Sequence, residues 1–168
     1  TQHRIAAFLD ARTAKIDALS SELTAFKSNL LLQKRSLVSE CVTKGIPNER
    51  ERAYKPSGLY WMGDIASNYE IVKLNNITSD KINDGPHTTP EFFDDGMPFL
   101  SVNNIQDHKL DFKNLRMVSK EAHEEYIKKA HPKKGDILLG KSASIGKTAI
   151  VDVDFEFSIW SPLALIKI

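Results

Sequence analysis

Several residue types and patterns are scarce in this 168-residue sequence, and each absence narrows the class of protein. The only cysteine is Cys41, so the chain cannot form an internal disulfide or a cysteine cluster that binds a metal ion. It has no apolar run of about 18 residues, and its N-terminus lacks the layout of a signal peptide. We therefore expect a cytoplasmic protein with no metal, no other cofactor and no membrane partner.

An excess of charge of one sign is also missing. The formal net charge is +1, so the overall balance gives no indication of nucleic-acid binding. Between residues 109 and 147, however, ten Lys and Arg residues stand against five Asp and Glu residues. This local excess fits a surface that follows a phosphate backbone, although lysines also solvate the face of an ordinary surface helix.

Neither proline nor glycine occurs before Gly45, so one long helix can form at the N-terminus. Apolar residues recur there in two rows at seven-residue spacing, which is typical of a coiled coil. The rows contain Ile5, Leu9, Ile16, Leu19, Leu23, Phe26, Leu30 and Leu37. The pattern predicts a helix of about 44 residues, roughly 65 Å long, that ends at Gly45 and Pro47. Because water penalises an exposed apolar stripe, we expect these residues to pack against another long helix.

Two polar residues, Arg12 and Gln33, interrupt the second apolar row. Polar residues at such positions fix the register of paired helices. We expect Arg12 and Gln33 to set register with the partner helix or to face a less buried part of the contact.

The rest of the sequence predicts an α+β body. Residues 47–60 are polar and interrupted by prolines, which is typical of a linker. Short apolar runs between turn residues then predict strands at IVKLNNI, MPFLSVNNI, GDILLG, KTAIVDV and LALIKI. The segment SKEAHEEYIKKAHP predicts a helix of about ten residues, with Ser119 as its N-cap and Pro132 as its stop. The expected organisation is a coiled-coil-type helix over residues 1–46, the linker, and a mixed α/β domain over residues 61–168.

The loop GKSASIGKT, residues 140–148, begins like a phosphate-binding P-loop. Five residues separate its glycines where a P-loop has four, and the strand-like sequence AIVDV follows instead of a helix. Nucleotide binding, a plain hairpin turn and a loop presented to a nucleic acid remain open. Lys141, Ser142, Ser144 and Lys147 suit the last of these, because they can contact phosphates or base edges.

A second loop, NDGPHTTP at residues 83–90, is stiffened by two prolines and carries Asn83, His87, Thr88 and Thr89. Binding residues are often found on loops of this kind. No Ser or Cys nucleophile with a matching acid can be proposed beside His87, so we expect no catalytic residues.

Two stretches resemble the DNA-specificity subunit of type I restriction-modification enzymes. QHRIAAFLDARTAKIDALSSEL, continuing to KRSLVSECVTKGI, is similar to the helical spacer of that family. Its Gln, Ile-Ala, Phe-Leu-Asp, Thr and Ile-Asp positions are Gln2, Ile5, Ala6, Phe8, Leu9, Asp10, Thr13, Ile16 and Asp17. WMGDIASNYEIVKLNNI, continuing through NDGPHTTP, GMPFLSVNNI and KKGDILLGKSASIGKTAIV, resembles the start of a target-recognition domain. The sequence SASIG departs from relatives, which commonly have a second glycine there.

The resemblance implies a non-catalytic protein that reads part of a bipartite site in double-stranded DNA. In this family two recognition domains alternate with two helices that pair antiparallel, and separate methyltransferase and restriction subunits carry out the chemistry. The expected partners are therefore double-stranded DNA, methyltransferase subunits and, through the complex, the restriction subunit. The recognition domain is expected to be incomplete. The alternative is a coiled-coil adaptor that binds protein and not DNA, and salt-dependent DNA binding would separate the two.

Overall fold

The structure is a computed structural model that describes residues 2–46, 53–142 and 144–168. The chain forms two compact units, Thr1–Ile71 and Val72–Ile168. Residues 47–52 of the expected linker lie outside the described residues. The remainder of that segment includes a strand, β1 (Tyr54–Pro56). The boundary between the two units follows Ile71, so it lies beyond the expected linker.

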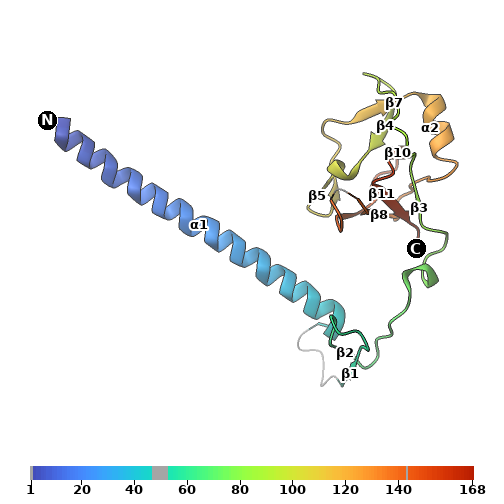
Figure 1. Ribbon diagram of the computed structural model, residues 1–168, viewed down its shortest axis with the longest axis horizontal. Helices are drawn as coiled ribbons and strands as arrows, with labels where there is room; N and C mark the ends of the chain where they lie inside the picture. The colour runs from blue at the N-terminus through green and yellow to red at the C-terminus, as the bar shows by residue number, and fades with distance from the viewer. Residues whose placement is uncertain (1, 47–52, 143) are drawn as a thin grey trace. The chain divides into compact units, whose positions relative to one another are not determined.

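The first unit consists of a long helix and a small hairpin. Helix α1 (Gln2–Lys44) is continuous over 43 residues, as predicted, and is blue in Figure 1. Gly45 ends it in a left-handed conformation with φ of 86°, and its N–H donates to the carbonyl of Cys41. β1 pairs antiparallel with β2 (Asp64–Ala66), and β2 contacts α1. The hairpin buries Ile65 and Ala66, so it gives this unit a small core.

The apolar rows of α1 lie on its surface. Their eight side chains are between 48% and 67% exposed, and no residue of α1 is buried. The described residues supply no second long helix, so pairing with such a helix stays a prediction. The Arg12 guanidinium lies 5.2 Å from the centre of the Phe8 ring on the same helix, and both Arg12 and Gln33 are exposed. Their proposed role in setting register is likewise untested.

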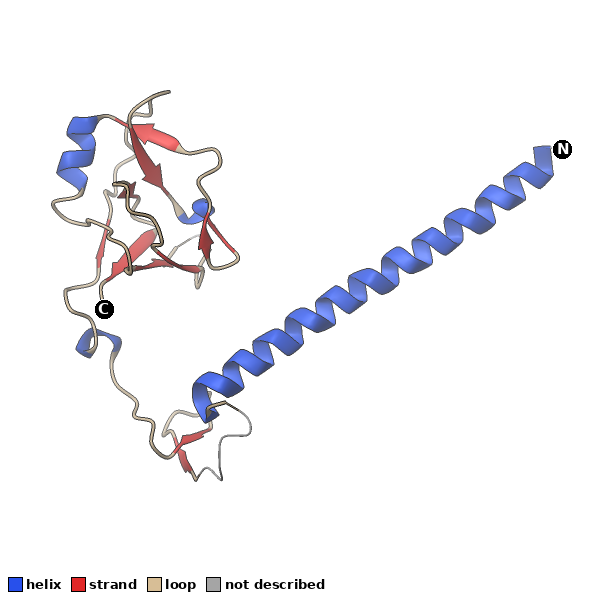
Figure 2. Cartoon of the chain, turned by 180° about the vertical axis from the view of Figure 1, so that it is seen from behind, coloured by secondary structure: helices blue, strands red, loops and turns tan. Residues whose placement is uncertain are grey.

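The second unit contains two larger sheets, a hairpin and a short helix (Figure 2). Its strands are β3 (Asn83–Asp84), β4 (Met97–Leu100), β5 (Ile105–Gln106), β6 (Lys109–Leu110), β7 (Arg116–Val118), β8 (Ile137–Gly140), β9 (Thr148–Ile150), β10 (Ser158–Ile159) and β11 (Leu163–Ile166). The antiparallel sheet has the order β3-β11-β8-β9, and the mixed sheet has the order β10-β4-β7 with β10 parallel to β4. β5 and β6 form a hairpin beside β9.

The core of this unit is built mainly from these strands and the segments that join them. Its members are Leu100, Val102, Ile105, Ala130, Leu138, Ala149, Val151, Phe157, Ile159, Leu163 and Leu165. Helix α2 (Lys120–Tyr126) contacts β10. Together with the long N-terminal helix, these sheets confirm the coarse expectation of an α+β fold.

The strands predicted at GDILLG, KTAIVDV and LALIKI are confirmed as β8, β9 and β11. The predicted cap of α2 is also confirmed, since the Ser119 hydroxyl accepts from the Ala122 N–H, although α2 has seven residues rather than about ten. The segment MPFLSVNNI divides into β4, the 3-10 helix η2 (Val102–Asn104) and the start of β5. A capping box between Ser101 and Asn104 causes this division by satisfying the backbone where the chain turns.

The predicted strand at IVKLNNI, residues 71–77, is wrong. This segment is a loop followed by the 3-10 helix η1 (Leu74–Asn76). No strand pairs with it in the described part of the chain, and the side chains of Ile71, Val72 and Leu74 are exposed. An apolar run becomes a strand only where a neighbouring strand can satisfy its backbone, and this run has none.

Candidate nucleic-acid interface

The two predicted binding loops meet at one partly buried carboxylate. Asp84, whose side chain is 14% exposed, accepts from the ammonium groups of Lys129, at 2.5 Å, and Lys141. The Nε2 atom of His87 lies 3.2 Å from the same carboxylate. We call these four residues the Asp84 cluster. It joins loop 83–90 to loop 140–148, which are far apart in the sequence.

Electrostatics keep Asp84 ionised. Burial alone would raise the pKa of its carboxyl, but hydrogen bonds and charges from Lys129 and Lys141 outweigh this effect and lower the pKa from 3.8 to about 2. At neutral pH the cluster therefore holds two ammonium groups against one carboxylate. The surplus positive charge suits contact with an anion.

Strand pairing positions the cluster. β11 pairs with β3 on one side and with β8 on the other, so the residues that follow these two strands lie near each other. Gly85 is required at the end of β3, because a Cβ atom there would lie 1.7 Å from the carbonyl oxygen of Ile159. This close approach seats the start of loop 83–90 against β10.

The predicted residues of loop 83–90 lie mostly on the surface. His87, Thr88 and Thr89 are exposed, whereas Asn83 is half-buried within β3. The structure thus brings His87 close to Lys141 through the Asp84 cluster, whereas Asn83 pairs with Leu165 of β11. DNA contact by any of these residues stays a prediction.

Loop 140–148 is a hairpin turn between β8 and β9. The Gly146 N–H donates to the Gly140 carbonyl, the Gly140 N–H donates to the Lys147 carbonyl, and strand β9 follows. A phosphate-binding P-loop would need a helix at that point, so the structure contradicts the interpretation of this loop as a nucleotide-binding P-loop. Ala143 lies outside the described residues.

The four predicted side chains of this loop divide into two groups. Lys141 and Ser142 are exposed, whereas Ser144 is half-buried. The half-buried Lys147 donates its ammonium hydrogen to the carbonyl of Ile105 at 3.0 Å. Lys147 is therefore tied to β5, apart from the Asp84 cluster.

A polar groove that the sequence did not predict lies in the same unit. Its volume is about 390 Å³, and its lining residues are Ser101, Asn103, Asn104, Gln106, Asp111, Lys113, Asn114, Arg116 and Trp160. We call it the amide groove, because four of these residues carry side-chain amides. Lys113 and Arg116 belong to the basic excess noted in the sequence, and the amide-rich run VNNIQ is a signal that could have pointed to the rest.

Three consecutive residues join the amide groove to both loops. Trp160 lines the groove, and the next residue, Ser161, donates its N–H to the carbonyl of Pro86 at 3.3 Å. The carbonyl of Pro162 then accepts from the Lys141 N–H at 2.9 Å. The groove and the two loops are therefore linked through one short segment of backbone.

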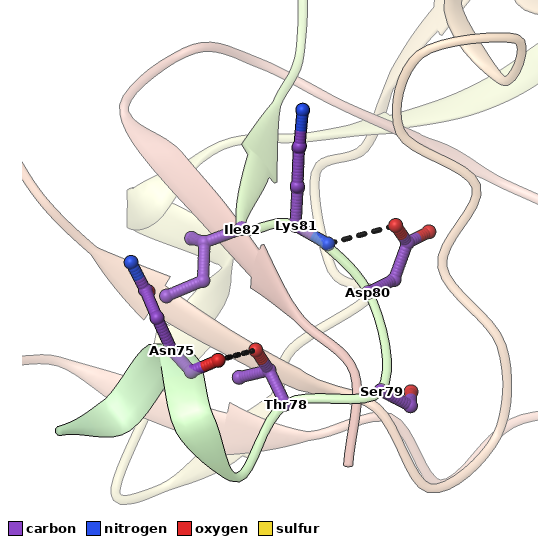
Figure 3. A pocket seen from close by; sticks show the side chains of 6 residues that line it. All are labelled: Asn75, Thr78, Ser79, Asp80, Lys81 and Ile82. Carbon is purple, nitrogen blue, oxygen red and sulfur yellow. Dashed lines mark hydrogen bonds between the residues drawn. The ribbon is translucent and has the colours of Figure 1, made fainter.

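A second cavity, of about 640 Å³, lies along the segment before β3 (Figure 3). It is lined by Asn75 and by residues 78–82. Its polar groups bond locally: the Thr78 hydroxyl donates to the Asn75 carbonyl, and the Lys81 N–H donates to the Asp80 carboxylate. None of the predicted binding residues lines it, so we leave it outside the candidate interface.

The sequence also gave no sign of a buried serine–histidine pair. The Ser158 hydroxyl lies 2.8 Å from Nδ1 of His123, and Glu156 lies 3.6 Å from Nε2 of the same ring. A serine, a histidine and a carboxylate that lie in a row, each within reach of the next, form the catalytic triad of many hydrolases. Ser158 is fully buried, however, so a substrate could not reach its hydroxyl. In this chain the pair ties α2 to β10.

No protein-family model matches the sequence, and no curated protein matches it significantly. Among the described residues, no group of three or more His, Cys, Asp or Glu side chains is arranged to hold a metal ion. None of the helices in the described part of the chain has both the length and the apolar character needed to cross a membrane.

Proposed function

We propose that this chain is a DNA-specificity module of a type I restriction-modification enzyme. It is cytoplasmic, has no cofactor or catalytic activity of its own, and reads part of a bipartite site in double-stranded DNA. One observation carries the proposal: the Asp84 cluster gathers the two loops predicted to bind DNA and two ammonium groups, and the segment 160–162 links them to the amide groove. Ammonium groups suit phosphate contacts, and side-chain amides suit contacts with base edges.

The two parts of this surface have different tasks in the proposal. Lys129 and Lys141 contact phosphates, which releases counterions and makes binding depend on salt. Their shared bonds to Asp84 hold both ammonium groups in place before DNA arrives, which limits the entropy lost on binding. Polar side chains around them then contact the bases.

Helix α1 has the second task, which is assembly. Its exposed apolar rows pair with another long helix and dock the methyltransferase subunit, which in turn brings the restriction subunit into the complex. An apolar surface of this length is costly in water, so a partner that covers it stabilises the assembly.

Selection from a pool of random duplex DNA tests the proposal. The 168-residue chain, alone and with a type I methyltransferase subunit, is incubated with the pool at several salt concentrations, and the bound duplexes are sequenced. We expect one enriched motif, with an affinity that falls steeply as salt rises. Binding without any enriched motif, or no DNA binding in either sample, would contradict the proposal.

The second candidate is a coiled-coil adaptor that binds protein. The observation that favours it is α1 itself, because all eight residues of the apolar rows are exposed. An adaptor would associate through α1 and leave the random DNA pool unbound at low salt. The same experiment therefore separates the two candidates.

A further inference from the structure

We propose that the amide groove reads purine bases through their N7 edges in the major groove of DNA, with Asn103, Asn114 and Arg116 as the readers. This inference rests on the function proposed above. It assigns base recognition to residues outside the two loops, and it leaves phosphate contacts to the Asp84 cluster.

Two of the four amides in the groove are already used inside the protein. The Asn104 side chain accepts from the Ser101 N–H at 2.9 Å and donates to the Asp111 carbonyl at 3.1 Å. The Gln106 amide donates to the Asn103 carbonyl at 3.1 Å. These bonds shape the groove wall, and they leave Asn104 and Gln106 with less capacity for a ligand.

The other two amides are exposed and unused. Neither the Asn103 nor the Asn114 side chain has a hydrogen-bond partner among the described residues. The backbone of Asn103 is fixed, because its N–H donates to the Ser101 hydroxyl and its carbonyl accepts from the Gln106 amide. Asn114 adopts a left-handed conformation with φ of 54°, which presents its side chain from a tight turn. An asparagine amide both donates and accepts, so it matches N6 and N7 of adenine in two parallel bonds.

Arg116 is held in a defined orientation. Its guanidinium carbon lies 4.7 Å from the centre of the Phe92 ring, so the aromatic face supports the charged plane. A guanidinium fixed in this way keeps its edge N–H groups available. Arginine pairs in two parallel bonds with O6 and N7 of guanine. Arg116 therefore recognises guanine, in addition to the adenine that the asparagines recognise.

The charge of the groove favours bases over backbone. Lys113 and Arg116 stand beside the carboxylate of Asp111, so the lining has a net charge of only about +1. The Asp111 carboxylate accepts from the Lys113 N–H at 2.9 Å, and this bond fixes it close to the rim. A fixed carboxylate repels phosphate and accepts from the amino group of cytosine, the partner of guanine. The groove thus resembles a base-reading site more than a phosphate site.

The test uses the duplex enriched by the wild-type chain. Each purine in it is replaced in turn by its 7-deaza analogue, which lacks the N7 acceptor. Affinities are then measured for the wild type and for three groove variants: Asn103→Ala, Asn114→Gly and Arg116→Lys. Glycine suits the positive φ of Asn114, and lysine keeps the charge of Arg116 while removing the planar fork. Asn76→Ala, an exposed asparagine outside the groove, is the matched control.

For each groove variant we expect the affinity for the enriched duplex to fall by about 5- to 150-fold. Replacing the purine that this residue reads by its 7-deaza analogue should lower the affinity of the wild type by a similar factor. The same replacement should cause little further loss of affinity in the variant that lacks the reading side chain. Binding of random DNA, its salt dependence and the affinity of Asn76→Ala should stay unchanged.

Two results would overturn the assignment while the proposed function stands. In one, the groove variants bind the enriched duplex as tightly as the wild type. In the other, they lose affinity equally for all sequences, which would make the groove a phosphate contact. If the wild-type chain enriches no motif at all, the proposed function itself fails.

Discussion

Replacement of Asp84 by Asn tests whether the Asp84 cluster stabilises the second unit. The asparagine keeps the size of the side chain and removes its charge, so Lys129 and Lys141 lose their shared ionic partner. A carboxyl with a pKa of 3.8 in the unfolded chain and about 2 in the folded chain would contribute about 2.5 kcal/mol at neutral pH. The lysine side chains are 53% and 40% exposed, and water screens such pairs. We therefore expect a loss of about 1–1.5 kcal/mol.

The effect should depend on pH. Because folding lowers the pKa of Asp84, its stabilising effect is complete above the unfolded value of 3.8 and is lost as the pH falls toward about 2. The difference between the wild type and Asp84→Asn should thus be constant from pH 7 to pH 5 and shrink to about half near pH 3.

Urea unfolding followed by the fluorescence of Trp160 measures this difference. The exposed Trp61 is first replaced by Phe, so that the signal comes from the second unit alone. Glu91→Gln is the control, because Glu91 is an exposed carboxylate without an ion pair among the described residues. Equal free energies of unfolding at pH 7, or a difference that stays constant down to pH 3, would refute the reasoning.

Four further substitutions test other contacts in the second unit. Ser158→Ala leaves Nδ1 of the buried His123 without its partner, so the free energy of unfolding should fall by about 1–3 kcal/mol in the same urea assay. Gly85→Ala drives a Cβ atom into the backbone of β10 and should cost about 3 kcal/mol or more, whereas Gly135→Ala, which meets open space at a positive φ, should cost about 1 kcal/mol. Lys141→Ala should weaken DNA binding equally for all sequences and lower the salt slope by about one in a titration. A slope equal to that of the wild type would exclude a phosphate contact at Lys141.

Local patterns predicted the elements that depend on local forces. The boundaries of α1 follow from apolar spacing and from Gly45, and both signals lie within a few residues of the feature they determine. β8, β9 and β11 are short apolar runs bounded by turn residues, and each finds a neighbouring strand. The run at residues 71–77 carries a similar signal but has no neighbour, so the same reasoning failed there.

The candidate site depends on contacts that no local pattern encodes. Lys129 and Lys141 reach Asp84 across 45 and 57 residues of sequence. The amide groove needs Trp160 beside residues 101–116, and the parallel pairing of β10 with β4 brings them together. The loops and the basic excess could be named as candidates from the sequence, but no local pattern shows that Lys147 bonds to the Ile105 carbonyl while Lys141 bonds to Asp84.

The position of β11 has a consequence for how the protein is made. β11 lies between β3 and β8, and it is buried along its whole length. Its pairing partner Asp84 leaves the ribosome about 80 residues before Ala164 does, which at ordinary rates of translation is roughly 4 to 16 s earlier. β8 emerges later within that interval, and until β11 pairs with them both β3 and β8 have an unpaired edge that can pair with other chains. The core formed by the described residues therefore assembles only after β11 emerges, and newly made chains are prone to aggregation until then.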